Sequence, residues 1–528
     1  MEAQREREPI SIQGVLPRTH SVSNTTETIT VSDVYSLQKD DWSAGATYAV
    51  FTNNPDPLAK GNVLKVTRSD EALGSLADIV SEYTYDNRYQ FVKTAKNPRG
   101  YTTTYVYDWE DSNSVNDPGR GNLVRIEYPA VSTGQPSTQT ISVHMTYNQY
   151  GQPVSSVDGE GNVTLNRYYT DGLGHDGFLF QRVTAYGVLD LTSEYDYDNV
   201  GNMTAQWPPR AFEPGATKDD YKTTYTVNEL DQVVKVTGGL LRTTGSDRKD
   251  SYFYFDANGN LTDVWEEYVT ASGTQPSDPG DLTSMGGFSK PTSAMAAGWV
   301  QSSTTYDILN RPTTRTVDAV AGGTTERYTS YTYYDAGDNV VVTLNAMGYK
   351  SRRVYDERNL TFQSVAGADS DVAATFTTNY DANGNVVTSV DARGYTSATY
   401  VYDGFDRATI VTDAAGHYRE SDYDVHGNVT ESRAFNSSNV LLSKSRSFFD
   451  ELDRAWKSER MAKDHLGIDI GDGWNTSTTL FDKNSRVTSA TDDNGVTSYR
   501  FYDAASRVAC TRDSVGNEVA ECVRGSTP

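Results

Sequence analysis

The segment Tyr380-Asp-Ala-Asn-Gly-Asn-Val-Val-Thr-Ser-Val-Asp-Ala-Arg-Gly394, followed by Tyr395-Thr-Ser-Ala-Thr-Tyr-Val-Tyr402, contains one full cycle of a repeat. Residues 386–390 alternate in side-chain type, which is the period-two pattern of a strand with two different faces. Asp391 and Gly394 then occupy the first and fourth positions of four residues, as in a type I turn in which the Asp side chain accepts backbone hydrogen bonds. Tyr400 and Tyr402 fall two apart on the returning strand. The segment therefore predicts a β-hairpin.

The same pattern recurs at a regular spacing along the chain. Tyr380-Asp381, Tyr402-Asp403 and Tyr423-Asp424 are 22 and 21 residues apart. Two strands and two turns account for this period, and a unit this small must stack on its neighbours to bury any surface. The sequence therefore predicts an all-β fold, a spiral of antiparallel β-hairpins, with under about 10% helix against a usual third.

The Tyr-Asp…Gly-Asn pattern resembles the YD repeat of the Rhs (rearrangement hotspot) family, which is shared with the C-component of insecticidal Tc toxins and with teneurins. The resemblance covers roughly residues 60 to 520. Further copies of the aromatic-Asp pair begin at Tyr85, Tyr107, Tyr197, Phe255, Tyr306, Tyr334, Tyr355, Phe449, Phe481 and Tyr502, and Gly-Asn pairs begin at Gly61, Gly121, Gly161, Gly201, Gly259, Gly427 and Gly516. The resemblance implies a YD-repeat shell, or part of one, that encloses a toxic or unfolded polypeptide.

The chain departs from this family near its C-terminus. Full-length Rhs and Tc-C proteins continue into a core-associated region with a Pro-x-x-x-x-Asp-Pro-x-Gly-type motif and self-cleaving aspartates, followed by a variable toxin. Residues 521–528 carry no such motif, and the Asp-Pro-Gly sequences at Asp117 and Asp278 fall in loops. No cleavage residue can therefore be carried over, and no cargo domain is recognisable.

Repetition also divides the chain. Residues 1–59 repeat weakly and are interpreted as a degenerate N-terminal β entry segment, while residues 60–528 form the YD-repeat β-spiral. Stretches rich in Pro, Gly, Ser and Asn interrupt the period and predict loop insertions near 109–136, 207–221 and 268–300.

Composition limits the partners. The formal charge is −25, from 71 acidic and 46 basic residues, so nucleic acid and anionic membrane surfaces are poor partners. No run approaches about 18 apolar residues, so no membrane insertion is expected. The first residues lack an apolar signal region, yet a secreted or bacterial cell-surface location is expected, with a signal elsewhere or export without a cleaved signal.

No pattern predicts a catalytic, cofactor-binding or metal site. Asp381-Ala-Asn-Gly-Asn385 lacks the glycine at position 6 and the glutamate at position 12 of a calcium-binding EF-hand loop, which favours a plain turn with Gly384 or Asn385 in the left-handed conformation. The abundant Asp residues lie at repeated turn positions. The histidines show no metal-ligand spacing: His20, His144, His175, His417, His426 and His465. Cys510 and Cys522 could bridge a hairpin, and the sequence leaves this open.

Two functions fit this sequence. The first is a structural shell without catalysis that encloses or scaffolds a polypeptide cargo such as a toxin, with a neighbouring shell segment as partner. The rival is a teneurin-like extracellular adhesin that binds carbohydrate or protein through exposed Tyr and Trp, with Trp207 and Trp299 as candidates. Open strand edges also predict self-association.

Overall fold

The computed structural model describes residues 20–22, 25–32, 62–70, 76–86, 88–110, 121–170, 172, 174–240, 248–267, 299–321, 324–463, 467–515 and 518–519. Within these residues the secondary structure is almost entirely β-strand, with two short 3-10 helices, η2 (Pro209–Phe212) and η3 (Lys218–Tyr221). The all-β prediction is confirmed.

The strands of the first half are β1 (His20–Val22), β2 (Thr25–Ser32), β3 (Lys65–Asp70), β4 (Ile79–Tyr85), β5 (Val92–Lys96), β6 (Thr102–Tyr107), β7 (Leu123–Glu127), β8 (Ser142–Tyr147), β9 (Pro153–Val157), β10 (Val163–Tyr168), β11 (Leu179–Thr184), β12 (Leu191–Tyr197), β13 (Met203–Trp207), β14 (Thr223–Val227), β15 (Val233–Leu240), β16 (Arg248–Phe255), β17 (Leu261–Glu267) and β18 (Trp299–Tyr306).

The strands of the second half are β19 (Pro312–Ala321), β20 (Thr324–Tyr334), β21 (Val340–Leu344), β22 (Lys350–Tyr355), β23 (Thr361–Ala366), β24 (Ala374–Tyr380), β25 (Val386–Val390), β26 (Thr396–Tyr402), β27 (Ala408–Asp413), β28 (Tyr418–Tyr423), β29 (Val429–Phe435), β30 (Leu441–Phe449), β31 (Ala455–Lys463), β32 (Asp469–Phe481), β33 (Val487–Thr491), β34 (Thr497–Tyr502), β35 (Val508–Asp513) and β36 (Glu518–Val519).

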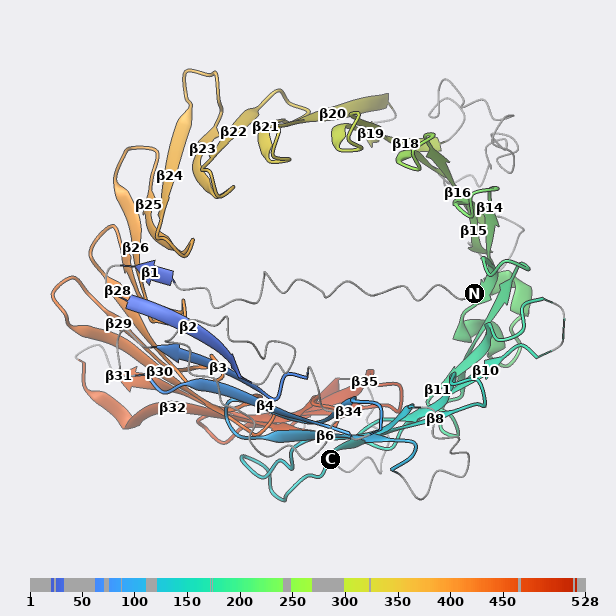
Figure 1. The fold of residues 1–528 in the computed structure, drawn as a ribbon, viewed down its shortest axis with the longest axis horizontal. Coiled ribbons are helices and arrows are strands. Elements are labelled where there is room, and N and C mark those ends of the chain that lie inside the picture. The colour runs from blue at the N-terminus through green and yellow to red at the C-terminus, as the bar shows by residue number, and fades with distance from the viewer. Residues whose placement is uncertain are drawn as a thin grey trace, which may run out of the picture.

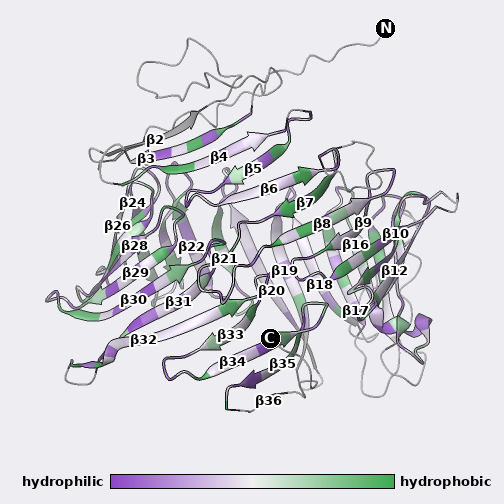
Figure 2. Ribbon diagram, turned by 90° about the horizontal axis from the view of Figure 1, so that it is seen from below, coloured by the Kyte–Doolittle hydropathy of each residue, from purple (hydrophilic) through white to green (hydrophobic). Residues whose placement is uncertain are grey.

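All of these strands belong to one antiparallel sheet with the simplest possible connectivity. Each strand pairs with the strand before it and the strand after it, as β24, β25 and β26 do. The sheet curls into a ring, and β28–β35 return alongside β2–β8 (Figure 1). Seen from the side, the first strands lie above the last ones, so the ring is a spiral whose two ends overlap (Figure 2). Below, these overlapping parts are called the first layer (β2–β10) and the last layer (β26–β36).

The sheet has no continuous apolar core. Every residue of β21 and of β25 is half-buried, so both faces of these strands remain accessible. The densest burial lies on β16 and β17, where Tyr252 is 1% exposed and Trp265 is 0% exposed. Most of the wall therefore resembles a single layer, and its stability must come from hydrogen bonds and turns as much as from apolar burial.

The predicted division of the chain stays a prediction. Most of residues 1–59, residues 111–120 and residues 268–298 lie outside the described residues. In the predicted insertion 207–221 the chain leaves the sheet after β13, passes through η2 and η3, and returns as β14.

Candidate functional site: the turn rows and the seam between layers

The hairpin turns form two rows, one along each end of the strands. The YD turns follow strands that end in the Tyr-Asp pattern; they begin at Asp86, Asp108, Asn148, Asp198, Asn228, Asp256, Asp307, Asp335, Asp356, Asp381, Asp403, Asp424, Asp450, Asp482 and Asp503. The return turns join the opposite ends; they begin at Asn97, Asp158, Ala185, Asn345, Gly367, Asp391, Asp413, Asn436 and Asp492.

The Asp that opens a turn organises it. In the YD turn at Asp381, the Gly384 amide donates to the Asp381 carbonyl at 3.2 Å, and the Asp381 amide donates to the Asn385 carbonyl at 2.9 Å. The Asp381 carboxylate accepts from the Asn385 amide at 2.8 Å. Gly384 has a φ of 91°, as predicted for the left-handed position. The register shifts at Tyr380, so the turn is a type I turn extended by a bulge.

In many YD turns the fifth residue is Asn or Arg and ties the turn to a neighbouring one. Where this residue is Asn, its side-chain amide reaches a neighbouring turn, as from Asn385 to Asp406 Oδ1 at 2.6 Å. Where it is Arg, it does more: Arg407 Nε donates to Asp403 Oδ2 at 2.7 Å and its Nη1 to the Asp424 carbonyl at 2.8 Å. The same guanidinium lies 4.9 Å from the ring centroid of Tyr423. Polar contacts therefore join many neighbouring YD turns along the row.

Most tyrosines that precede a YD turn also have a structural partner. Tyr402 donates its hydroxyl to the Val386 carbonyl on the preceding strand at 2.9 Å. The same bond recurs at Tyr85, Tyr107, Tyr147, Tyr168, Tyr306, Tyr334, Tyr355, Tyr380, Tyr423 and Tyr502. Burial, with a contribution from the nearby Asp86 carboxylate, raises the pKa of Tyr107 to about 12, so this phenol stays protonated and donating. These tyrosines are primarily structural.

A seam forms where return turns of the first layer meet YD turns of the last layer. Arg99 Nη1 donates to the Asp450 carbonyl and to Asp453 Oδ1, both at 2.6 Å, and Nη2 donates to the Phe449 carbonyl at 3.1 Å. Its Nε lies 3.5 Å from Asp424 Oδ2. One arginine of the first layer thus holds two YD turns of the last layer.

Further polar contacts continue the seam in both directions. Glu451 accepts hydrogen bonds from the Ser132 and Thr133 hydroxyls at 2.9 and 2.8 Å. Asn484 Nδ2 donates to Asp158 Oδ2 at 2.8 Å. Burial opposes ionisation of Glu451, but backbone amides and these hydroxyls outweigh it and lower its pKa.

Close packing accompanies these bonds. Trp456 lies against Gly134, where an added Cβ would come within 2.4 Å of the indole Cδ2. Phe405, in the YD turn at Asp403, is 4% exposed, and the Arg68 guanidinium lies 5.5 Å from its ring centroid. The seam is therefore a packed interface and not a chance approach of two loops.

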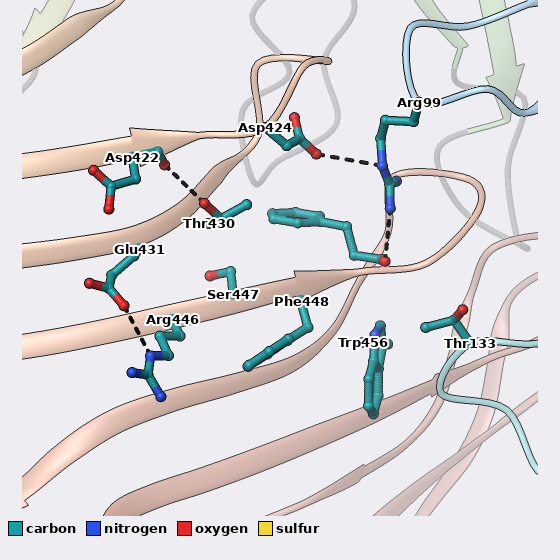
Figure 3. Close-up of a pocket in the computed structure, with 11 residues that line it drawn as sticks. Arg99, Thr133, Asp422, Asp424, Thr430, Glu431, Arg446, Ser447, Phe448 and Trp456 are labelled. Atoms are coloured by element: carbon teal, nitrogen blue, oxygen red, sulfur yellow. Dashed lines mark hydrogen bonds and ion pairs between the residues drawn. The ribbon is translucent and has the colours of Figure 1, made fainter. Parts of the chain in front are cut away.

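A pocket of about 530 Å³ opens beside the seam (Figure 3). Arg99 and Thr133 reach it from the first layer, and the remaining lining comes from β28–β31 and their turns: Asp422, Asp424, Thr430, Glu431, Arg446, Ser447, Phe448, Phe449 and Trp456. Burial disfavours the Glu431 carboxylate, but hydrogen bonds from Lys444, Arg446 and Arg433 lower its pKa to about 2. Its carboxylate is thus fully engaged, which suits a structural joint better than acid-base chemistry.

The described histidine and carboxylate side chains do not form a metal site. Within the described ranges no three His, Cys, Asp or Glu side chains are placed to hold a metal ion. His417 contacts Asp413 in its own turn at 3.3 Å, and His426 contacts Asp453 at 2.5 Å as part of the seam. No described helix is long and apolar enough to cross a membrane.

The remaining residues singled out in the sequence are two tryptophans, the two cysteines and two of the histidines. Trp207 is covered by Lys218 and Lys222, whose ammonium groups lie 4.5 and 4.8 Å from its ring centroid. Cys510 is buried, while Cys522 and His465 lie outside the described residues, so the bridge stays a prediction. The side chains of Trp299 and His20 also fall outside them.

Comparisons with known proteins agree with this geometry. Residues 380–418 match the family model of the RHS repeat. The fold is similar to a crystal structure of TcdB2-TccC3-Cdc42, with a TM-score of 0.52 and 10% identity, covering 86% of this chain and 23% of that one. It is also similar to the Tc holotoxin pore of Photorhabdus luminescens with a variant TccC3, with a TM-score of 0.50 and 10% identity, covering 86% and 24%. No curated protein matches. The chain thus spans about a quarter of those chains and shares their fold over that part.

Proposed function

We propose that this chain, in which residues 380–418 match the RHS repeat, is a YD-repeat protein whose curled sheet is the wall of a shell that encloses a polypeptide cargo and performs no catalysis of its own. The observation that carries the proposal is the architecture of the wall. One sheet curls round and its ends overlap at the seam (Figure 1). Strands such as β21 and β25 keep both faces accessible.

The surface chemistry supports a container without sequence preference. On neighbouring strands, residues directly opposite each other share a face, and the partners Thr377–Val390 and Thr388–Thr399 place hydroxyls beside aliphatic groups. A surface of this kind offers many weak contacts and few strong ones. It can therefore hold an unfolded chain without a fixed binding motif.

Site-specific cross-linking tests the proposal. A photoreactive residue replaces Val401, which is 51% exposed, or its neighbour Tyr400 on the other face, and the chain refolds with a labelled unfolded polypeptide as probe. Enclosure predicts cross-links from one face only, at equivalent positions in many repeats, together with protection of the probe from protease. Cross-links from both faces, or a fully digested probe, would overturn it.

The adhesin alternative has weaker support. The lysines over Trp207 occupy the ring face on which a sugar would stack. Self-association through strand edges is a further part of the proposal, because β1 pairs only with β2 and β36 only with β35 within the described residues. Secretion and a bacterial cell surface remain part of the same proposal.

A further inference from the structure

We infer that the turn rows left uncovered by the seam form a docking surface for a second copy of this chain, which adds a layer through the seam's own contacts. The proposed contact between copies is the same as that at the seam, where a return turn with Arg99 binds the YD turn at Asp450. This inference does not depend on whether the wall encloses a cargo.

In several YD turns the third residue is apolar, and this is the part that we expect to insert. Within the seam, Phe405 occupies this position and is 4% exposed, and Leu452 is half-buried. Outside the seam, the same position carries large apolar residues in the open: Tyr150 is 73%, Val200 74%, Leu230 54% and Leu309 62% exposed. In these six turns the apolar side chain is therefore covered where a layer lies against the turn and exposed where none does.

One uncovered return turn repeats the receiving chemistry. Asn97-Pro-Arg-Gly-Tyr101 in the seam and Asp391-Ala-Arg-Gly-Tyr395 outside it share the Arg-Gly-Tyr sequence. In both turns the guanidinium lies over the ring of the Tyr two residues later, at 5.2 Å and 5.5 Å. Both turns also close with the same backbone bond from the fourth residue to the first, at 2.9 Å. The second turn is therefore built as the first one is.

Only the surroundings of the two turns differ. The Arg99 side chain is 16% exposed, whereas the Arg393 side chain is 79% exposed and reaches only Asp391 of its own turn, at 2.7 Å. Tyr101 is half-buried, whereas Tyr395 is 65% exposed. Arg393 can therefore accept a further YD turn as Arg99 does.

Neighbouring return turns extend this surface. Met347 is 76%, Tyr349 64%, Val440 55% and Val496 40% exposed, all in return turns of the second half of the chain. A row of exposed apolar side chains rimmed by polar turns is typical of a protein interface. Together with Arg393 and Tyr395 these residues form what we call the receiving row.

The occupant that fits is a second copy, because one chain carries both complementary rows. The exposed inserting residues belong to YD turns between β8 and β19, and the receiving row belongs to return turns between β21 and β34. The contact is therefore heterologous, and copies would stack head to tail. The net charge of −25 opposes this contact, so added salt should strengthen it by screening.

Sedimentation analysis with two variants tests the inference. Arg393→Glu damages only the receiving row, and Leu309→Asp damages only the inserting row. Matched controls place the same charge changes on the sheet face, at the exposed residues Arg353 (Arg353→Glu) and Val401 (Val401→Asp). Circular dichroism confirms that each variant keeps its β-sheet.

The expected result is concentration-dependent association of the wild type and both controls. Arg393→Glu and Leu309→Asp should each weaken this association at least roughly tenfold. Mixing the two variants should restore a dimer, since each supplies the row that the other lacks, but nothing larger. A wild type that stays monomeric at every concentration and salt would overturn the inference. Undiminished association of both Arg393→Glu and Leu309→Asp would also overturn the inference, and would point to pairing through strand edges.

Discussion

The guanidinium of Arg99 and the backbone carbonyl of Asp450 are 351 residues apart in the sequence and 2.6 Å apart in the structure. The contact joins a return turn of the first layer to a YD turn of the last layer. Because each described strand otherwise pairs only with its sequence neighbours, such contacts are what join the overlapping ends of the curled sheet.

Replacing Arg99 should open the seam locally. Arg99→Ala removes hydrogen bonds to Asp453 and to two backbone carbonyls, and charged hydrogen bonds of this kind are each worth about 1.5–3 kcal/mol. Hydrogen exchange should rise in residues 448–456 and 97–101 and stay unchanged on β20–β22. The matched control is Arg393→Ala, measured in dilute protein, because it alters the same turn sequence without a contact between layers. Equal effects of both substitutions would contradict the role of the seam.

Asp450 should be the most sensitive turn-opening Asp of the seam. It is 0% exposed, it accepts from the Leu452 and Arg454 amides, and its Oδ2 lies 2.7 Å from Arg454 Nε. Asp450→Ala would leave a largely buried guanidinium without its carboxylate, which costs about 3–5 kcal/mol. Asp391→Ala, in an exposed turn, should cost much less. Local hydrogen exchange around each turn measures the difference, and a smaller effect at Asp450 than at Asp391 would count against this account.

Substitutions at two glycines can distinguish the cost of backbone strain from the cost of overpacking. Gly394 has a φ of 83° with no atom within 4 Å of an added Cβ, so Gly394→Ala should cost only the left-handed backbone term of about 1–2 kcal/mol. Gly134 has a φ of 72° and meets Trp456, so Gly134→Ala should add about 1–3 kcal/mol of overpacking. Tryptophan fluorescence should change with the second substitution and not with the first. If Gly134→Ala changed neither stability nor tryptophan fluorescence, Trp456 and Gly134 would not be in close contact.

Acid should release the seam only at low pH. Asp158, Asp424 and Glu451 all have a lowered pKa in the folded chain: burial opposes ionisation, and hydrogen bonds from neighbouring side chains and backbone amides outweigh it. A lowered folded pKa gives stability that is complete above the unfolded value, about 4, and is lost as the pH falls through the folded value. Hydrogen exchange at the seam should therefore be constant from pH 7 to pH 5, after correction for the intrinsic rate, and increase below about pH 4. Opening between pH 7 and pH 5 would require another titrating group.

Local features of the fold were predictable from the sequence, because five residues are enough to specify a turn. The hairpin period, the Asp that opens each turn and the left-handed Gly384 all follow from local chemistry. The cross-strand role of Tyr402 was missed, since a hydroxyl bond to Val386 has no sequence signature beyond the repeat itself. The seam could not be predicted at all: Arg99 and Arg393 lie in nearly identical turns, and only curvature accumulated over many strands decides which one meets a second layer.

The most direct test of the account is a cryo-electron microscopy map of the isolated chain. The account predicts a single-layer sheet that curls into a ring, with the turn at Arg99 seated on the turn at Asp450 and the pocket beside Trp456 between the layers. A map with an extended or sandwich-like sheet, in which β4–β6 and β30–β32 lie apart, would contradict it.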